Sequence, residues 1–160
     1  MIFRFGNYTL DVDVERTRAF YSRPDVMTTS EKCVCTGCQN YDAAILLTSP
    51  KVLDFFESLG IDPRKPAEVY DLLGGDPDEE GKMYYNGWYH VCGVRLQGGD
   101  AWVNVTDEMK HLDNAKMYAV DDSFKLSFEE GTMMLHEDFP TPVLQMEIDA
   151  HLPWVLPKKK

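Results

Sequence analysis

Closely spaced strands in the second half of the chain constrain the fold more than any other feature of the sequence. Alternating apolar and polar residues predict strands at 88–97, 102–106, 117–120, 124–128 and 143–150. Parallel strands need a crossover of a dozen or more residues, usually a helix, and the turns here are shorter. The pattern therefore predicts a mostly antiparallel sheet, with a sandwich as the alternative arrangement, and disfavours a doubly wound α/β fold.

Two glycine-containing turns are expected in this region, which should extend over about 82–156. Asn86-Gly87 is a strong hairpin signal and predicts a turn between Met83–Tyr85 and the strand that begins at Trp88. Gly98-Gly99-Asp100 predicts a second hairpin into 102–106.

The first half predicts one strand followed by an insert of two to three helices at about 39–75. Tyr8, Leu10, Val12 and Val14 alternate with polar residues, as in a strand with one solvated face. Helical spacing then begins at Asn40. The fold class expected from both halves is α+β, with the helices set between the N-terminal strand and the main sheet.

The best-marked helix begins after Ser49, an N-cap residue, with Pro50 at its first position. Gly60 ends the helix, and Ile61 is expected to fold back on its last turn. The apolar residues of the helix share one face: Val52, Phe55, Phe56 and Leu59. A third, shorter helix is expected from Pro66 to Leu73.

Length and composition indicate one globular domain over 1–160. A chain of 160 residues, 44% of them hydrophobic, can bury a core without disulfides. The end, 157–160, contains three lysines and is expected to be a solvated basic tail.

The acidic character of the protein limits its partners. The formal net charge of −11 repels a phosphate backbone and an anionic membrane, so neither nucleic acid nor a membrane is expected as a partner, whereas a basic protein is. The sequence has neither the apolar stretch of a signal peptide nor a run long enough to cross a membrane, which favours a cytoplasmic location.

Three cysteines within six residues form the main candidate for chemistry. Cys33, Cys35 and Cys38 lie just before the expected helices, and the last two form a Cys-x-x-Cys turn. Zinc takes about four soft ligands in a tetrahedron, and such a turn commonly supplies two of them. In a reducing compartment a disulfide framework is not expected, so metal ligation, redox chemistry and plain burial remain open.

A fourth ligand has to come from the strand at 88–97. His90 and Cys92 point to the same side of a strand, so Cys35, Cys38, His90 and Cys92 form one hypothetical zinc site, with Cys33 as a substitute ligand. The alternative interpretation is that Cys92 is a small buried residue and His90 a core histidine.

The sequence favours a non-enzymatic binding or accessory domain whose cysteine cluster serves the fold. The alternative is a thiol-dependent redox or nucleophilic enzyme or sensor that uses Cys35 or Cys38, because a helix N-terminus lowers the pKa of a nearby thiol. No set of residues typical of catalysis or of phosphate binding accompanies the cysteines.

Overall fold

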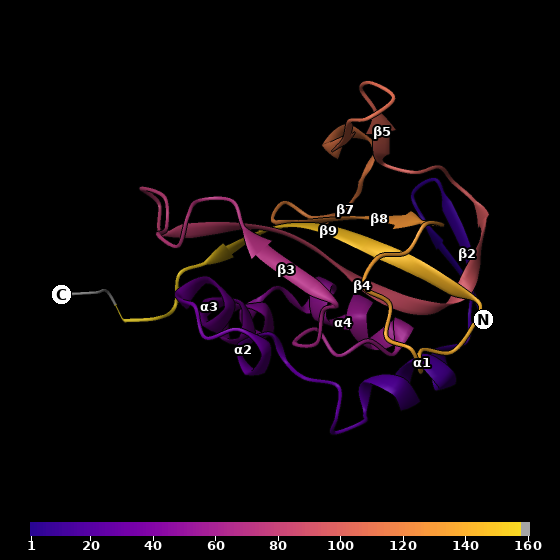
Figure 1. Ribbon diagram of the computed structural model, residues 1–160, viewed down its shortest axis with the longest axis horizontal. Helices are drawn as coiled ribbons and strands as arrows, with labels where there is room; N and C mark the ends of the chain where they lie inside the picture. Colours follow the sequence, from indigo (N-terminus) through magenta and orange to yellow (C-terminus); the bar gives the residue numbers. More distant parts are fainter. Residues whose placement is uncertain (158–160) are drawn as a thin grey trace.

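The computed structural model describes residues 1–157, so most of the expected tail at 157–160 lies outside the described residues. The described chain forms a mostly antiparallel sheet with helices on one face and a small two-stranded ribbon on the other (Figure 1). The fold is therefore α+β, as the sequence predicts. The long strands belong to one sheet, so the alternative of a sandwich is wrong.

The main sheet has the order β1-β2-β4-β9-β8-β7, and β3 pairs with β4. Its strands are β1 (Ile2–Phe5), β2 (Tyr8–Val12), β3 (Glu68–Asp71), β4 (Lys82–Gln97), β7 (Tyr118–Asp121), β8 (Phe124–Glu129) and β9 (Val143–Pro153). The ribbon consists of β5 (Trp102–Asn104) and β6 (Lys110–Leu112). The helices are α1 (Val14–Tyr21), α2 (Thr29–Lys32), α3 (Thr36–Ala44) and α4 (Pro50–Leu59), with 3₁₀ turns η1 (Ile45–Leu47) and η2 (Asn114–Lys116).

The long strand β4 corrects the prediction of a hairpin at Asn86-Gly87. The strand continues through both residues, and Asn86 pairs with Asp149 of β9. A Cβ at Gly87 would meet the backbone of β3, 2.9 Å from the Cα of Val69. This glycine thus permits a close approach of two strands, which the sequence pattern did not distinguish from a turn.

Two further predictions in this region are wrong. The segment predicted as a third helix from Pro66 to Leu73 contains strand β3, because it pairs with β4. The turn at 98–100 does not form a hairpin with β4, since β5 pairs with β6 in the separate ribbon. Tertiary pairing overrides local helix signals in the first case and local turn signals in the second.

The helical part begins earlier than the predicted boundary near residue 39. Helix α1 starts at Val14, where a strand residue was expected, because the Asp13 side chain accepts a hydrogen bond from Arg16 N at 3.1 Å and caps it. Helix α4 agrees with its prediction. Ser49 caps it, Gly60 is left-handed with φ of 78°, and Ile61 N donates to Phe56 O at 3.0 Å.

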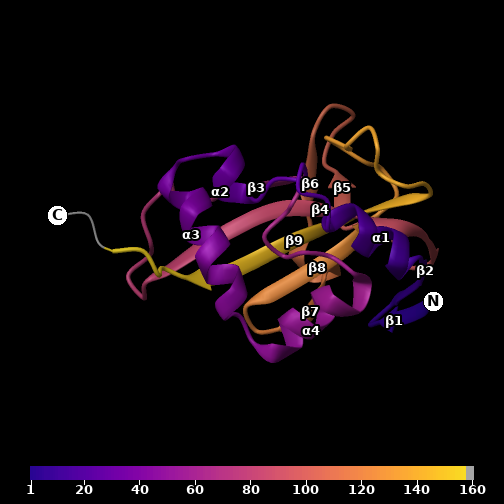
Figure 2. The same ribbon diagram turned by 90° about the horizontal axis from the view of Figure 1, so that it is seen from below.

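The core lies between the helices and the face of the sheet that they cover (Figure 2). Fully buried rings fill it, and the hydroxyls of Tyr41 on α3 and Tyr89 on β4 form a hydrogen bond at 2.5 Å. Among the described residues, no helix is both long and apolar enough to cross a membrane. The core fixes α3 on the sheet, and with it the cysteine segment at the start of that helix.

Candidate metal centre

The cysteine segment connects two helices. Helix α2 ends at Lys32, Cys33 follows in an extended conformation, and Cys35 is the N-cap of α3. Extended backbone directs the side chains of residues two apart to the same side, and the first helical turn then brings Cys38 back toward Cys35. Local geometry alone thus gathers the three sulfurs, as the spacing predicts.

The three sulfurs form a cluster of the right size for one metal ion. Their Sγ atoms all lie within 4.8 Å of one another, and those of Cys33 and Cys35 are 3.2 Å apart. Zinc–sulfur bonds of about 2.3 Å in a tetrahedron place sulfurs about 3.8 Å apart. None of the four cysteines is in a disulfide. We refer to Cys33, Cys35 and Cys38 as the cysteine cluster.

Exposure and pKa differ within the cysteine cluster. Cys33 and Cys35 are exposed, whereas Cys38 is buried. The backbone N–H of Cys35, followed by the side chains of Cys35 and Cys38, lowers the pKa of the Cys33 thiol. Burial raises the pKa of the Cys38 thiol well above its ordinary value, and the neighbouring sulfurs raise it further. A positive charge such as a metal ion would therefore favour full ionisation of the cysteine cluster.

Long-range hydrogen bonds fix the start of α3 to the sheet. Tyr85 of β4 donates from its hydroxyl to Gly37 O at 2.8 Å and accepts from Asn40 Nδ2 at 3.2 Å. Asn40 also donates to Pro153 O at 3.1 Å and accepts from Val155 N at 2.8 Å. The only sign of these supporting residues in the sequence is a polar residue on the inward face of α3.

Lys32 brings a cation close to the cysteine cluster. Its Nζ donates to Pro66 O at 2.6 Å and to Ala67 O at 3.1 Å, which ties the end of α2 to the segment before β3. Burial lowers the pKa of Lys32, and the nearby Glu68 and Cys38 partly offset this effect.

The structure does not bring His90 and Cys92 to the cysteine cluster. His90 is 3% exposed, its Nε2 lies 3.2 Å from Gln145 Oε1, and burial lowers its pKa. Cys92 is fully buried, and its backbone N donates to Thr17 Oγ1 at 3.0 Å. Within residues 1–157, the cysteine cluster is the only group of three or more His, Cys, Asp or Glu whose ligand atoms lie within 4.8 Å of one another. Three of the five candidate ligands thus converge.

Comparisons with known proteins add no functional information. No family model, no curated protein and no solved structure compared with the chain matches it. The function is therefore inferred from the geometry and chemistry of the chain itself.

Proposed function

We propose that the protein is a non-enzymatic accessory domain in which Cys33, Cys35 and Cys38 hold one zinc ion. The observation that carries this proposal is the convergence of three sulfurs within 4.8 Å. Thiolates are soft ligands that select zinc and other thiophilic metals over magnesium or calcium. The fourth ligand comes from outside the cysteine cluster, and the exposure of Cys33 and Cys35 leaves room for a water molecule or a donor from a partner.

The zinc ion has an architectural role in this proposal. Helix α2 has only four residues and is too short to be stable by itself. A metal that bridges Cys33 and the first turn of α3 holds the two helices together, and metal binding then contributes directly to folding. With a net charge of −11, the domain suits a basic protein partner in the cytoplasm.

Zinc titration of cysteine variants tests the proposal. The untagged protein is expected to bind one zinc ion, measured by competition with a chromophoric chelator. Cys38→Ser should weaken binding by more than about 100-fold, because loss of an outer-shell contact alone costs about 10–100-fold. Cys92→Ala is the matched control and should bind like the wild type. Equal zinc affinities of the Cys38→Ser and Cys92→Ala variants would refute the site.

One observation favours a second candidate, a redox-active thiol pair. Cys33 is exposed, its pKa is lowered, and its sulfur lies 3.2 Å from that of Cys35, itself the N-cap of α3. In thiol–disulfide exchange, a thiolate of the cysteine cluster attacks a partner disulfide and expels one partner thiolate. A second cysteine of the cysteine cluster then displaces the other, so that the cysteine cluster is oxidised by two electrons and the partner disulfide is reduced.

Alkylation kinetics separate the two candidates. A redox or nucleophilic thiol predicts a pH midpoint of alkylation well below about 8.5, the value for a free cysteine. It also predicts that a mixed disulfide with oxidised glutathione can be trapped after removal of Cys35. If the metal-free protein alkylates no faster than free cysteine, this candidate fails while the zinc proposal stands.

A further inference from the structure

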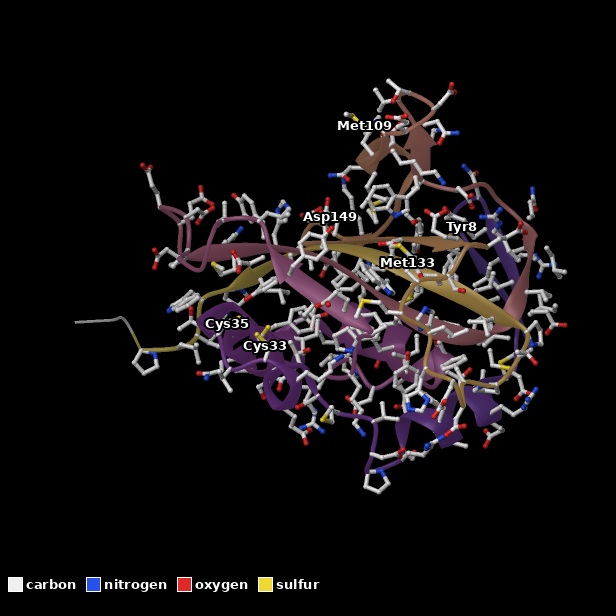
Figure 3. All side chains as sticks on the ribbon, viewed as in Figure 1. Tyr8, Cys33, Cys35, Met109, Met133 and Asp149 are labelled. Carbon is white, nitrogen blue, oxygen red and sulfur yellow. The ribbon has the colours of Figure 1, made fainter. Side chains whose placement is uncertain are left out.

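The sheet face opposite the helices carries a row of buried polar side chains. Glu129 on β8 and Gln145 and Glu147 on β9 point to this face, and they are 4%, 2% and 1% exposed, respectively. Carboxylate side chains are almost never buried to this degree without a partner. Asp149, further along β9, lies on the same side of the sheet as the two-stranded ribbon, as Figure 3 shows.

The ribbon and the loop after β8 cover this row. Ala101 N and Trp102 N donate to Glu129 Oε1 at 2.9 and 3.2 Å, and Met133 N donates to Gln145 Oε1 at 2.7 Å. A cavity of about 360 Å³ lies beneath them, and its lining includes Trp102, Met133 and the row of buried polar side chains. Ligand cavities usually have a volume of about 300–1,000 Å³. We call this cavity the ribbon pocket.

Polar atoms in the ribbon pocket lack partners. Glu129 Oε2 and Trp102 Nε1 are buried and make no hydrogen bond with any described residue. The carboxyl of Asp100 interacts with that of Glu129, and two carboxylates can hydrogen-bond only when one of them holds a proton. The indole N–H of Trp102 faces Glu147 without forming a hydrogen bond of normal geometry. A buried carboxylate with an unused oxygen has a free-energy cost that a donor from a ligand would remove.

The buried carboxylates form no ion pair, although Lys110 also lines the ribbon pocket. Across residues 1–157, no lysine or arginine forms an ion pair with Glu129 or Glu147. Arg95 is close, but its Nη1 is 2.6 Å from Asp100 Oδ1 and 2.6 Å from Phe128 O. Burial, and next the neighbouring Asp100, raises the pKa of Glu129 to about 7. Burial also raises the pKa of Glu147, and the Gln145 amide and the Trp102 indole N–H only partly offset this effect.

We propose that the ribbon pocket binds a small organic cation, an alkylammonium or guanidinium group with an apolar body. Its charged end donates to Glu129 and Glu147, and its apolar part packs against Trp102 and Met133, where cation–π attraction adds to the burial. A metal ion fits less well, because the three pocket carboxylates do not all lie within 4.8 Å of one another as the three sulfurs of the cysteine cluster do.

Titration followed by ¹H–¹⁵N NMR tests the proposal. n-Butylammonium is expected to shift the Trp102 indole N–H signal saturably, and neutral n-butanol of similar shape should bind at least about tenfold more weakly, as expected for loss of a charged hydrogen bond. Equal binding of both compounds, or the absence of a saturable shift with n-butylammonium, would overturn the proposal.

Charge-matched variants locate the binding. Glu147→Gln keeps the side-chain shape and should weaken n-butylammonium binding about tenfold or more. Glu79→Gln removes the same charge from the exposed loop before β4 and should bind like the wild type. Equal effects of the two variants would contradict a specific site.

If the Glu147→Gln variant does not fold, the pH dependence of n-butylammonium binding to the wild type tests the proposal instead. Protonation of Glu129 removes the acceptor for the cation, so n-butylammonium affinity should fall as the pH decreases below about 7. The other charged groups facing Glu129 are Asp100, Arg95, Lys110 and Glu147. An affinity that does not change with pH would count against the proposal.

A further titration distinguishes two sources of the cation, a free small molecule and a lysine side chain of a partner protein. An N-acetyl, C-amidated lysine peptide is titrated beside n-butylammonium. Tighter binding of the free amine assigns a small molecule, and tighter binding of the peptide assigns a lysine side chain of a partner. Both results support the cation site.

Discussion

The cysteine cluster and the ribbon pocket lie on opposite faces of one sheet and present opposite arrangements of potential ligands. Cys33 and Cys35 lie on the helical side of the sheet (Figure 3) and are exposed. Their sulfurs and that of Cys38 lie within 4.8 Å of one another. Glu129 and Glu147 are buried beneath the ribbon, and together with Asp100 they do not form a group of three carboxylates within 4.8 Å of one another. Three converging soft atoms suit a single metal ion, whereas a pair of buried carboxylates suits the charged end of an organic cation.

Zinc is expected to stabilise the whole fold, and this is the largest effect that distinguishes the two regions. At a free zinc concentration a thousandfold above Kd, the free energy of unfolding should increase by about 4 kcal/mol. Thermal unfolding with and without zinc measures this increase. The Cys38→Ser variant should lose most of it, and Glu147→Gln should keep all of it. A similar loss in both variants would break the distinction between the regions.

Asn40→Ala should destabilise the cysteine side of the molecule. Asn40 is fully buried, and its side-chain amide joins α3 to Tyr85, Pro153 and Val155. The free energy of unfolding should decrease by about 2–3 kcal/mol, because buried groups lose their partners. Urea unfolding measures this change. Zinc affinity should fall while n-butylammonium affinity stays unchanged, and a reversed pattern would contradict the assigned roles.

Glu129→Gln should change how stability depends on pH, which is the smallest of the three effects. The pKa of Glu129 is raised from 4.5 to about 7, so between these values the folded protein keeps a proton that the unfolded chain has lost. The contribution of Glu129 is thus fully present below about pH 4.5 and is lost as the pH rises through about 7.

The Gln variant should flatten this decrease by about 1–2 kcal/mol, less than the full shift implies, because solvent screens the open side of the ribbon pocket. Urea unfolding at several pH values measures it. Glu79→Gln, the exposed control, should leave the profile as in the wild type. Identical profiles for the Glu129→Gln variant and the wild type would show that this carboxyl titrates normally.

The parts of the fold that the sequence predicts are those set by local interactions. Helix α4 has a capping residue, an apolar face and a terminal glycine within thirteen residues of one another, and the cysteine cluster forms from residues only five apart. The antiparallel sheet also follows from its short connections.

The features that were missed depend on distant pairings. Gly87 signals a close approach of β3 that no local pattern reveals. Gln145, Glu147 and Asp149 alternate with apolar residues, so they read as a solvated face of β9. Gln145 and Glu147 are buried because the ribbon and the loop after β8 fold over this part of the face. Likewise, His90 and Cys92 share a strand, but their distance from the cysteine cluster depends on where α3 packs.

X-ray absorption at the zinc edge of the zinc-loaded protein tests the central claim most directly, because it counts the sulfurs bound to the metal. The account predicts three sulfur ligands at about 2.3 Å and one lighter nitrogen or oxygen ligand. A spectrum that contains only nitrogen and oxygen ligands would contradict it.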